Sequence, residues 1–504
     1  MIRALCVAAL AASCVPKIEP GPIPTEQAAA PVRLVELPVE ASPIVYFQAM
    51  IAAGSAFDPV GKEGLAALTA SAMAEAGAGE WTAKELKDLL YPTGASLTRV
   101  VDRDWVSFRL ACHRDHTDIC LDVFSAVITA PRFEEADVLR LRGQAEYSVG
   151  DGMLANIERL GDEALDAWLF EGHPYGHPVE GRTGVLPLLT PDHARDFYEQ
   201  HYVREAVLAG LAGGYDEDLR DALMQRLEAL APVQMPDNAL QQPIGFEGRH
   251  LLFVEAPDAS VGFHLGHPLP VSRNHPDWVP LHVALMAFGE HRESYGRLYR
   301  AIRTARGLNY GDYAYVEPFT QRGYTSLPEN GVLRRQQYFS MWLRPIASDN
   351  AAFGLKLAVD ELERLVADGL DAEEFDNTVA HLKGTTAVLA RNPGRRLAYT
   401  LDAEATGTPM LLDWLPEALD GIDNDDVTRA LQTHLKPQDL RIVAVGGSAE
   451  TIHAALLDGT RTPITYTDVE PSTEQAERDS EIATKDLGID PADAHRVEAK
   501  GIFR

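Results

Sequence analysis

The same order of strands and helices occurs twice along the sequence. An alternating apolar run at residues 104–112 recurs at residues 336–344, and each copy precedes two amphipathic helical patterns. Two apolar strands each end in a Gly-Gly pair, at 213–214 and 446–447, which lie 233 positions apart. A repeat of this length indicates two similar domains rather than a solenoid of short units. We therefore predict an α+β fold with two similar domains, each a mixed or antiparallel sheet with helices packed on one face.

Composition and the repeat divide the 504 residues into six segments. A stretch rich in Pro, Gln and Asn separates the two copies, and the C-terminal stretch is charged and poor in apolar residues. In chain order we predict a signal peptide, a tether, a first domain, a linker, a second domain and a loosely ordered polar tail, at residues 1–14, 15–31, 32–231, 232–245, 246–467 and 468–504.

The N-terminal residues have the pattern of a bacterial secretion signal. One Arg precedes a short apolar run, and residues 11–14, Ala-Ala-Ser-Cys, resemble a lipoprotein signal-peptidase site, with the usual Leu one place early at Leu10. An ordinary cleaved signal is the alternative. We predict that Cys14 is lipidated and that the chain is a periplasm-facing lipoprotein of a bacterial cell envelope, held at the membrane by this anchor.

The charge of the chain excludes one class of partner. Acidic residues number 75 and basic residues 45, which gives a net charge of −30. Because phosphate would be repelled by such a surface, we expect no nucleic-acid partner. The acidic residues are dispersed along the chain, as in an ordinary solvated surface.

Two cysteines remain after the predicted processing. Cys112, His113, His116 and Cys120 fall within nine residues, which suggests a metal site at first sight. Cys112 and His113 are neighbours at the end of a predicted strand, however, and the other two lie one turn apart on the next helix. We favour two unpaired thiols, with a disulfide and a metal site as alternatives.

A second candidate site lies around a helix-to-strand turn. Apolar residues from Tyr295 to Ile302 recur at helical spacing, and Gly307 is a natural end for the helix. Arg303 and Tyr310 therefore lie on either side of a tight turn, where a guanidinium and a phenol can both donate hydrogen bonds to a carbonyl oxygen. The alternative is an arginine paired with a carboxylate and a tyrosine packed in a core.

The run R-x-x-x-G-L-x-Y at residues 303–310 resembles the second-domain signature of the insulinase/pitrilysin family of zinc metallopeptidases. The resemblance implies that Arg303 and Tyr310 bind the substrate backbone opposite the zinc. It also implies a peptidase built from four such domains, in two clamshell halves around a closed chamber. This chain is long enough for one half.

The zinc-binding end of the family motif is degenerate. Active members carry G-L-A-H-x-x-E-H, whose histidines hold zinc and whose glutamate activates water. Here Gly64-Leu65-Ala66 is followed by Ala67 and Ser71 at the two histidine positions and by Ala70 at the glutamate position. The family's third ligand falls near Glu146, a lone carboxylate. We predict no metal and no cofactor in this chain, with zinc only in a partner subunit.

Three functions remain open. The first is a non-catalytic subunit of an insulinase-like zinc metallopeptidase, which supplies Arg303 and Tyr310 to an H-x-x-E-H-bearing subunit of the same family and acts on peptides or unfolded segments. The second is a structural, scaffold or peptide-binding lipoprotein without a proteolytic role. The third is an active metalloendopeptidase that uses unrecognised ligands. We expect the chain to be inactive on its own.

Overall fold

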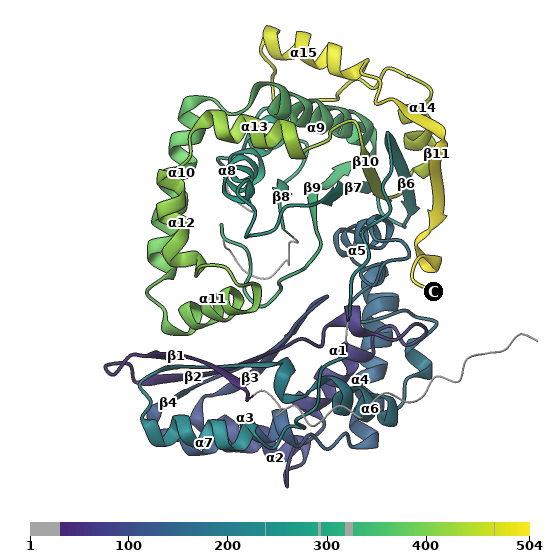
Figure 1. The fold of residues 1–504 in the computed structure, drawn as a ribbon. Coiled ribbons are helices and arrows are strands. Elements are labelled where there is room, and N and C mark those ends of the chain that lie inside the picture. The colour runs from purple at the N-terminus through teal and green to yellow at the C-terminus, as the bar shows by residue number, and fades with distance from the viewer. Residues whose placement is uncertain (1–30, 237, 291–293, 318–325, 468) are drawn as a thin grey trace, which may run out of the picture.

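The computed structural model describes residues 31–236, 238–290, 294–317, 326–467 and 469–504. The predicted signal peptide, Cys14 and nearly all of the tether lie outside the described residues. Two domains are stacked on one another, the first in the lower part of Figure 1 and the second above it. No helix among the described residues is both long and apolar enough to cross a bilayer.

The first domain contains a five-stranded sheet in the order β1-β5-β2-β4-β3, parallel between β1 and β5 and otherwise antiparallel. The strands are β1 (Arg33–Pro38), β2 (Ile44–Ile51), β3 (Ser96–Val101), β4 (Val106–His113) and β5 (Val207–Gly213). The helices are α1 (Leu65–Glu75), α2 (Ala83–Leu90), α3 (Thr117–Thr129), α4 (Glu135–Tyr147), α5 (Ile157–Leu169), α6 (Pro191–His201) and α7 (Glu217–Leu227).

The second domain contains a six-stranded sheet in the order β11-β6-β10-β7-β9-β8. The strands are β6 (Arg249–Glu255), β7 (Ser260–Leu269), β8 (Asp312–Tyr315), β9 (Gln337–Ala347), β10 (Leu440–Gly446) and β11 (Ile489–Glu498). The helices are α8 (Trp278–Gly289), α9 (Ser348–Asp368), α10 (Ala372–Leu389), α11 (Pro393–Thr406), α12 (Leu411–Asp420), α13 (Asn424–His434), α14 (Ala449–Leu457) and α15 (Thr473–Ala483).

The duplication predicted from the sequence is confirmed, because the order β1-β5-β2-β4-β3 recurs as β6-β10-β7-β9-β8. The spacing of 233 holds for β5 and β10, which begin at Val207 and Leu440. The first strands begin at Arg33 and Arg249, only 216 positions apart. The difference arises because the connection from β8 to β9 is longer than the connection from β3 to β4.

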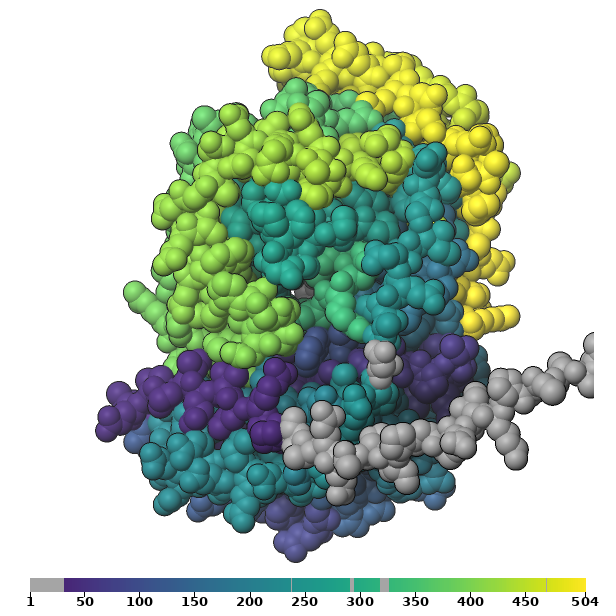
Figure 2. All heavy atoms as spheres, viewed as in Figure 1, coloured from purple at the N-terminus to yellow at the C-terminus, as the bar shows by residue number. Residues whose placement is uncertain are grey.

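One face of each sheet is covered by a helix from the other domain. Helix α5 of the first domain packs on β7 and β10, and its counterpart α11 packs on β1 and β5, as Figure 1 shows for α11. Two glycines 233 positions apart allow this approach. A Cβ atom at Gly161 would lie 2.2 Å from the His264 ring, and one at Gly394 would lie 2.4 Å from the Tyr46 ring. The space-filling view shows the two domains in contact along a broad boundary (Figure 2).

The C-terminal tail is ordered, so the prediction of a loosely ordered tail is wrong. Helix α15 lies against α9, and β11 extends the second sheet beside β6. Phe503 then returns to the first domain, where it is 4% exposed within the core and its carbonyl oxygen accepts hydrogen bonds from Thr183 at 2.9 and 3.0 Å. The tail therefore ties the two domains together (Figure 1).

Candidate functional site

The residues at the zinc-ligand positions lie on α1, which packs in the first-domain core. Ala67 is 8% exposed and Ala70 is fully buried, and neither carries a donor atom for a metal. The Ser71 hydroxyl donates to the Ala67 carbonyl oxygen at 2.7 Å. This part of α1 therefore offers a single hydroxyl, already engaged, where the active family motif has two imidazoles and a carboxylate.

An arginine from the neighbouring strand β3 contacts Ser71. Arg99 on β3 donates to the Ser71 hydroxyl oxygen through Nη2 at 2.8 Å and Nε at 3.2 Å. Its Nη1 pairs with Glu75 at 2.7 Å. The Ser71 hydroxyl oxygen is therefore already engaged by a side chain of this domain.

Glu146 does not complete a metal site. It pairs with Arg142 at 3.1 Å, one turn away on the same helix α4. It is also absent from the residues that line the cavity beside Ala67 and Ser71. The residues of the first domain therefore do not fit the zinc ion of the family's active members.

The cavity beside α1 has a volume of about 570 Å³ and is rich in charged side chains. Asp162 and Glu163 on α5 line one wall. Burial raises the pKa of Glu163 to about 7 and raises the pKa of Asp162 well above its usual value. Burial also opposes ionisation of Asp166, but Arg334 and Arg103 outweigh it and lower the pKa of that carboxyl.

Buried ion pairs cross from the cavity into the second domain. Arg334 donates to both oxygens of Asp102, at 2.8 and 2.9 Å, and to Asp166 at 3.2 Å. The Arg103 side chain is 1% exposed and pairs with Asp166 at 3.0 Å. Sequence reasoning missed this network, although the pattern Asp-Arg-Asp at 102–104 in a buried stretch was a signal that could have found it.

The structure places Arg303 and Tyr310 together at the surface. The Arg303 guanidinium lies over the Tyr310 ring at 4.1 Å from its centroid, and its Nη1 donates to the Asn309 carbonyl oxygen at 3.0 Å. Tyr310 is 73% exposed. Gly307 has the left-handed φ of +66° that was predicted for the turn, although the preceding helix is a short π-helical segment, Tyr299–Thr304.

These contacts differ from those expected for an arginine paired with a carboxylate and a tyrosine packed in a core. Among the described residues no carboxylate pairs with Arg303, and Tyr310 is not packed in a core. Tyr310 lines a pocket of about 390 Å³ with the start of α5, where Glu158 pairs with Arg344 of β9 at 2.7 Å. Helix α5 thus carries residues of this pocket at its N-terminus and residues of the degenerate zinc end one to two turns later.

Cys112 and Cys120 are both buried as free cysteines. The Cys112 thiol donates a hydrogen bond to Cys120, and this bond together with burial raises the pKa of Cys112 above its usual range. The cluster of metal-ligating side chains found among the described residues lies elsewhere, at His275, Asp277 and His434 in the second domain. The sequence analysis did not find this cluster, because His434 lies 157 positions from Asp277.

Both halves of the duplicated α+β chain match models of one peptidase family. Residues 38–183 match Insulinase (Peptidase family M16), and residues 188–382 match Peptidase M16 inactive domain. The chain belongs to the insulinase family, peptidase family M16. The inactive-domain model matches residues 188–382, which do not include α1. The conclusion that the zinc ligands are lost therefore rests on the residues of α1 themselves.

Relatives of this chain include proteins with different descriptions. It is 24% identical over 360 residues to an uncharacterized zinc protease of Streptomyces coelicolor, covering 69% of this chain and 73% of that protein. A peptidase M16 inactive domain from Pseudomonas fluorescens superposes with a TM-score of 0.73 at 20% identity, covering 83% of this chain and 96% of the other. A Helicobacter pylori protease gives 0.70 at 14% identity, covering 83% and 98%.

The same fold also occurs in a chain of Complex III2 from Candida albicans, with a TM-score of 0.65 at 15% identity, covering 82% of this chain and 93% of that one. At these identities the likeness concerns the fold alone. A fold shared by a protease, an inactive domain and a chain of Complex III2 does not decide the function, which must be argued from the site.

Proposed function

We propose that this chain is a non-catalytic subunit of an insulinase-like zinc metallopeptidase. In this proposal Arg303 and Tyr310 contact the substrate peptide, and a chain of the same family with an intact H-x-x-E-H motif supplies the metal. The observation that carries the proposal is the stacked Arg303–Tyr310 pair, whose exposed Tyr310 lines a pocket. In the same chain, Arg99 of β3 is bonded to Ser71 at the degenerate zinc end of α1.

The geometry of the pair suits recognition of a peptide carbonyl. The stacking on Tyr310 and the bond to Asn309 restrict the Arg303 side chain, so less rotamer freedom is lost on binding. The exposed phenol has a hydroxyl group available to a ligand. Hydrogen bonds from a charged donor are stronger than neutral ones and strengthen further as negative charge develops on the carbonyl oxygen.

The other two functions have less support from the site. A peptidase that acts alone needs a catalytic metal or nucleophile, and the described residues around α1 do not provide a ligand set. A scaffold without a proteolytic role has no need for an exposed Arg–Tyr pair, and substitution of the pair would then leave every complex of the chain unchanged.

The test is reconstitution with a candidate partner, chosen as a secreted or lipid-anchored family member of similar length with an intact H-x-x-E-H motif. We expect the two chains to elute as one heterodimer and to cleave an extended peptide, and this chain alone to cleave none. The partner alone is the control. Cleavage by the partner alone that is unchanged on adding this chain would contradict the proposal.

We also propose that the chain is anchored in the bacterial envelope through lipidated Cys14, on the pattern of residues 11–14. Because one acyl chain binds a bilayer only weakly, stable anchoring requires several chains on this cysteine. We expect Cys14→Ser to move the protein from the membrane fraction to the soluble fraction, as measured by fractionation and immunoblotting. Equal membrane association of the variant would show that the lipid assignment is wrong.

A further inference from the structure

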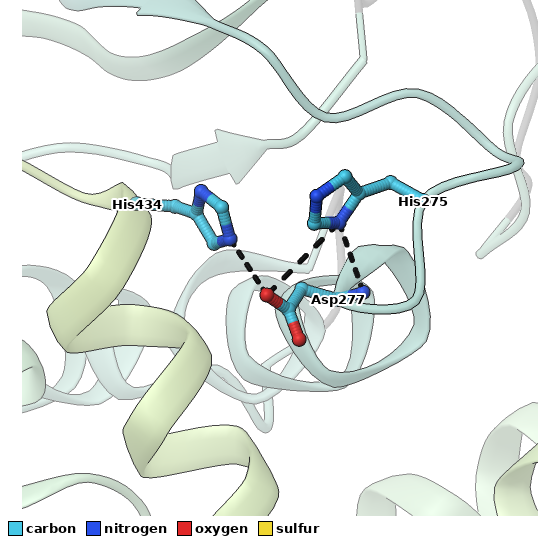
Figure 3. Close-up of side chains that lie close together, drawn as sticks. All are labelled: His275, Asp277 and His434. Atoms are coloured by element: carbon cyan, nitrogen blue, oxygen red, sulfur yellow. Dashed lines mark hydrogen bonds and ion pairs between the residues drawn. The ribbon is translucent and has the colours of Figure 1, made fainter.

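A cluster of two histidines and one aspartate lies in the second domain, far in sequence from the degenerate motif. His275 lies in the turn before α8, Asp277 is the N-cap residue of α8, and His434 is the last residue of α13 (Figure 3). His434 Nε2 lies 2.7 Å from Asp277 Oδ2, and His275 Nδ1 lies 4.0 Å from the same oxygen. The two imidazole rings meet edge to face, with centroids 5.2 Å apart.

We propose that His275, Asp277 and His434 form a binding site for a divalent cation of the zinc type. One potential ligand atom from each residue lies within 4.8 Å of the other two. Zinc bonds of about 2.0–2.2 Å place two ligands of one ion no more than about 4.4 Å apart. His275 Nδ1 accepts a hydrogen bond from the Asp277 backbone N–H at 3.1 Å. Rotation of the His275 side chain, which is 34% exposed, would exchange this bond for the ion and close the remaining gap.

The surrounding contacts hold the carboxylate in place for this role. Arg429 Nη1 donates to Asp277 Oδ1 at 2.8 Å, which leaves Oδ2 directed at the imidazoles. His434 lies against the other oxygen, so both oxygens of the Asp277 carboxylate are held by partners. Arg429 thus acts as the outer partner that orients a ligand.

The helices that carry the cluster are packed on each other. Every residue of α8 is buried, and α13 packs along it. Asp277 and His434 are each only 10% exposed, whereas His275 faces the solvent side. Two imidazoles and a carboxylate are a ligand set that zinc takes, and three protein ligands leave a position for water or another group.

The first domain shows that the fold itself does not require this cluster. Its equivalent helix α1 has Gly64 at the N-cap in place of Asp277. The counterpart of His434 is His201, whose ring packs on Phe197 at 4.2 Å and near Phe57 at 5.4 Å. The polar cluster is thus particular to the second domain and separate from the family's zinc position. It does not depend on the proposed role of the Arg–Tyr pair.

The test is a titration of the chelator-treated full chain with Zn²⁺ by calorimetry and with Co²⁺ by visible absorption. We expect one equivalent to bind, with the d–d bands of cobalt bound to nitrogen and oxygen ligands, and Zn²⁺ to raise the Tm. His434→Gln and His275→Gln should each lower the affinity for the ion by a larger factor than the loss of an outer partner does, which is about 10–100-fold. His275→Gln decides if His434→Gln fails to fold.

Two control variants locate the ion. His113 and Asp115 form the same His-x-Asp turn, with Nδ1 at 3.3 Å from the carboxylate, but lie outside the cluster, so His113→Gln should leave binding unchanged. Glu146→Gln should also have no effect, because Glu146 is in the first domain. The proposal is overturned if the wild-type chain binds neither ion, if both cluster variants bind as wild type does, or if Glu146→Gln abolishes binding.

Discussion

Arg303→Ala and Tyr310→Phe are each expected to lower kcat/KM of the reconstituted heterodimer by about one to three powers of ten, while assembly is unchanged. Loss of one donor to a developing oxyanion costs about 2–4 kcal/mol at the transition state. Tyr310→Phe removes only the hydroxyl and keeps the ring on which Arg303 stacks. The measurement is kcat/KM on an extended peptide, with the heterodimer checked by size-exclusion chromatography.

The controls for this experiment must be exposed residues outside the pair. Arg306 is close in sequence but unsuitable, because it is 4% exposed and paired with Asp479 at 2.5 Å. Arg364→Ala, at an exposed position on α9, and Tyr91→Phe, at a site 87% exposed, are the matched changes. If the two test variants stay within about twofold of wild type, below about 0.5 kcal/mol, the pair has no role in cleavage and a scaffold role gains support.

The metal content of the purified chain must be interpreted together with the cluster of His275, Asp277 and His434. Bound zinc in the wild-type chain would not show an active first domain, because the second domain offers its own ligand set. Zinc that remains in the His434→Gln variant would be the sign of a site elsewhere. The His434→Gln substitution therefore distinguishes zinc bound at the second-domain cluster from zinc bound elsewhere in the chain.

The fold was predictable from the sequence where periodicity reports burial. The alternating strand patterns and the helical periodicity of apolar residues predicted both domains. Gly307 predicted the turn between Arg303 and Tyr310, because few residue types adopt the left-handed backbone conformation. The tail was not predictable by the same argument. Strand β11 is polar and adds to a sheet edge, and a single aromatic residue, Phe503, fixes the end of the chain.

Contacts between residues far apart in sequence were the part of the site that could not be predicted. Arg99 lies 28 positions from Ser71, and His434 lies 157 positions from Asp277, so no local spacing connects them. Charged residues in a single sequence are also expected at the surface, since an unpaired charge is costly to bury. The buried arginines of the domain interface depend on partners that only the folded chain brings together.

Arg334→Ala is expected to destabilise the chain by about 3–5 kcal/mol, the cost of removing one partner from a buried ion pair. Arg334 is buried at the domain interface, with 6% of its side chain exposed, and it is bonded to Asp102 and Asp166 of the first domain. Without it, both carboxylates stay buried, with Arg103 as the remaining cation beside Asp166. Urea unfolding followed by tryptophan fluorescence and circular dichroism measures the effect.

The control separates this buried pair from ordinary surface charge. Arg396→Ala breaks an exposed pair with Asp413, a change worth about 0–1 kcal/mol.

Because Arg334 bridges the domains, we also expect the fluorescence and circular-dichroism transitions to lose their common midpoint in the Arg334→Ala variant, as the domains begin to unfold separately. Arg334→Met combined with Asp102→Asn should recover part of the loss, since it removes the carboxylate left without a cation and keeps Asp166 as the partner of Arg103. A loss below about 1 kcal/mol for Arg334→Ala would show that water or neighbouring residues compensate and that the ion pairs do not hold the two domains together.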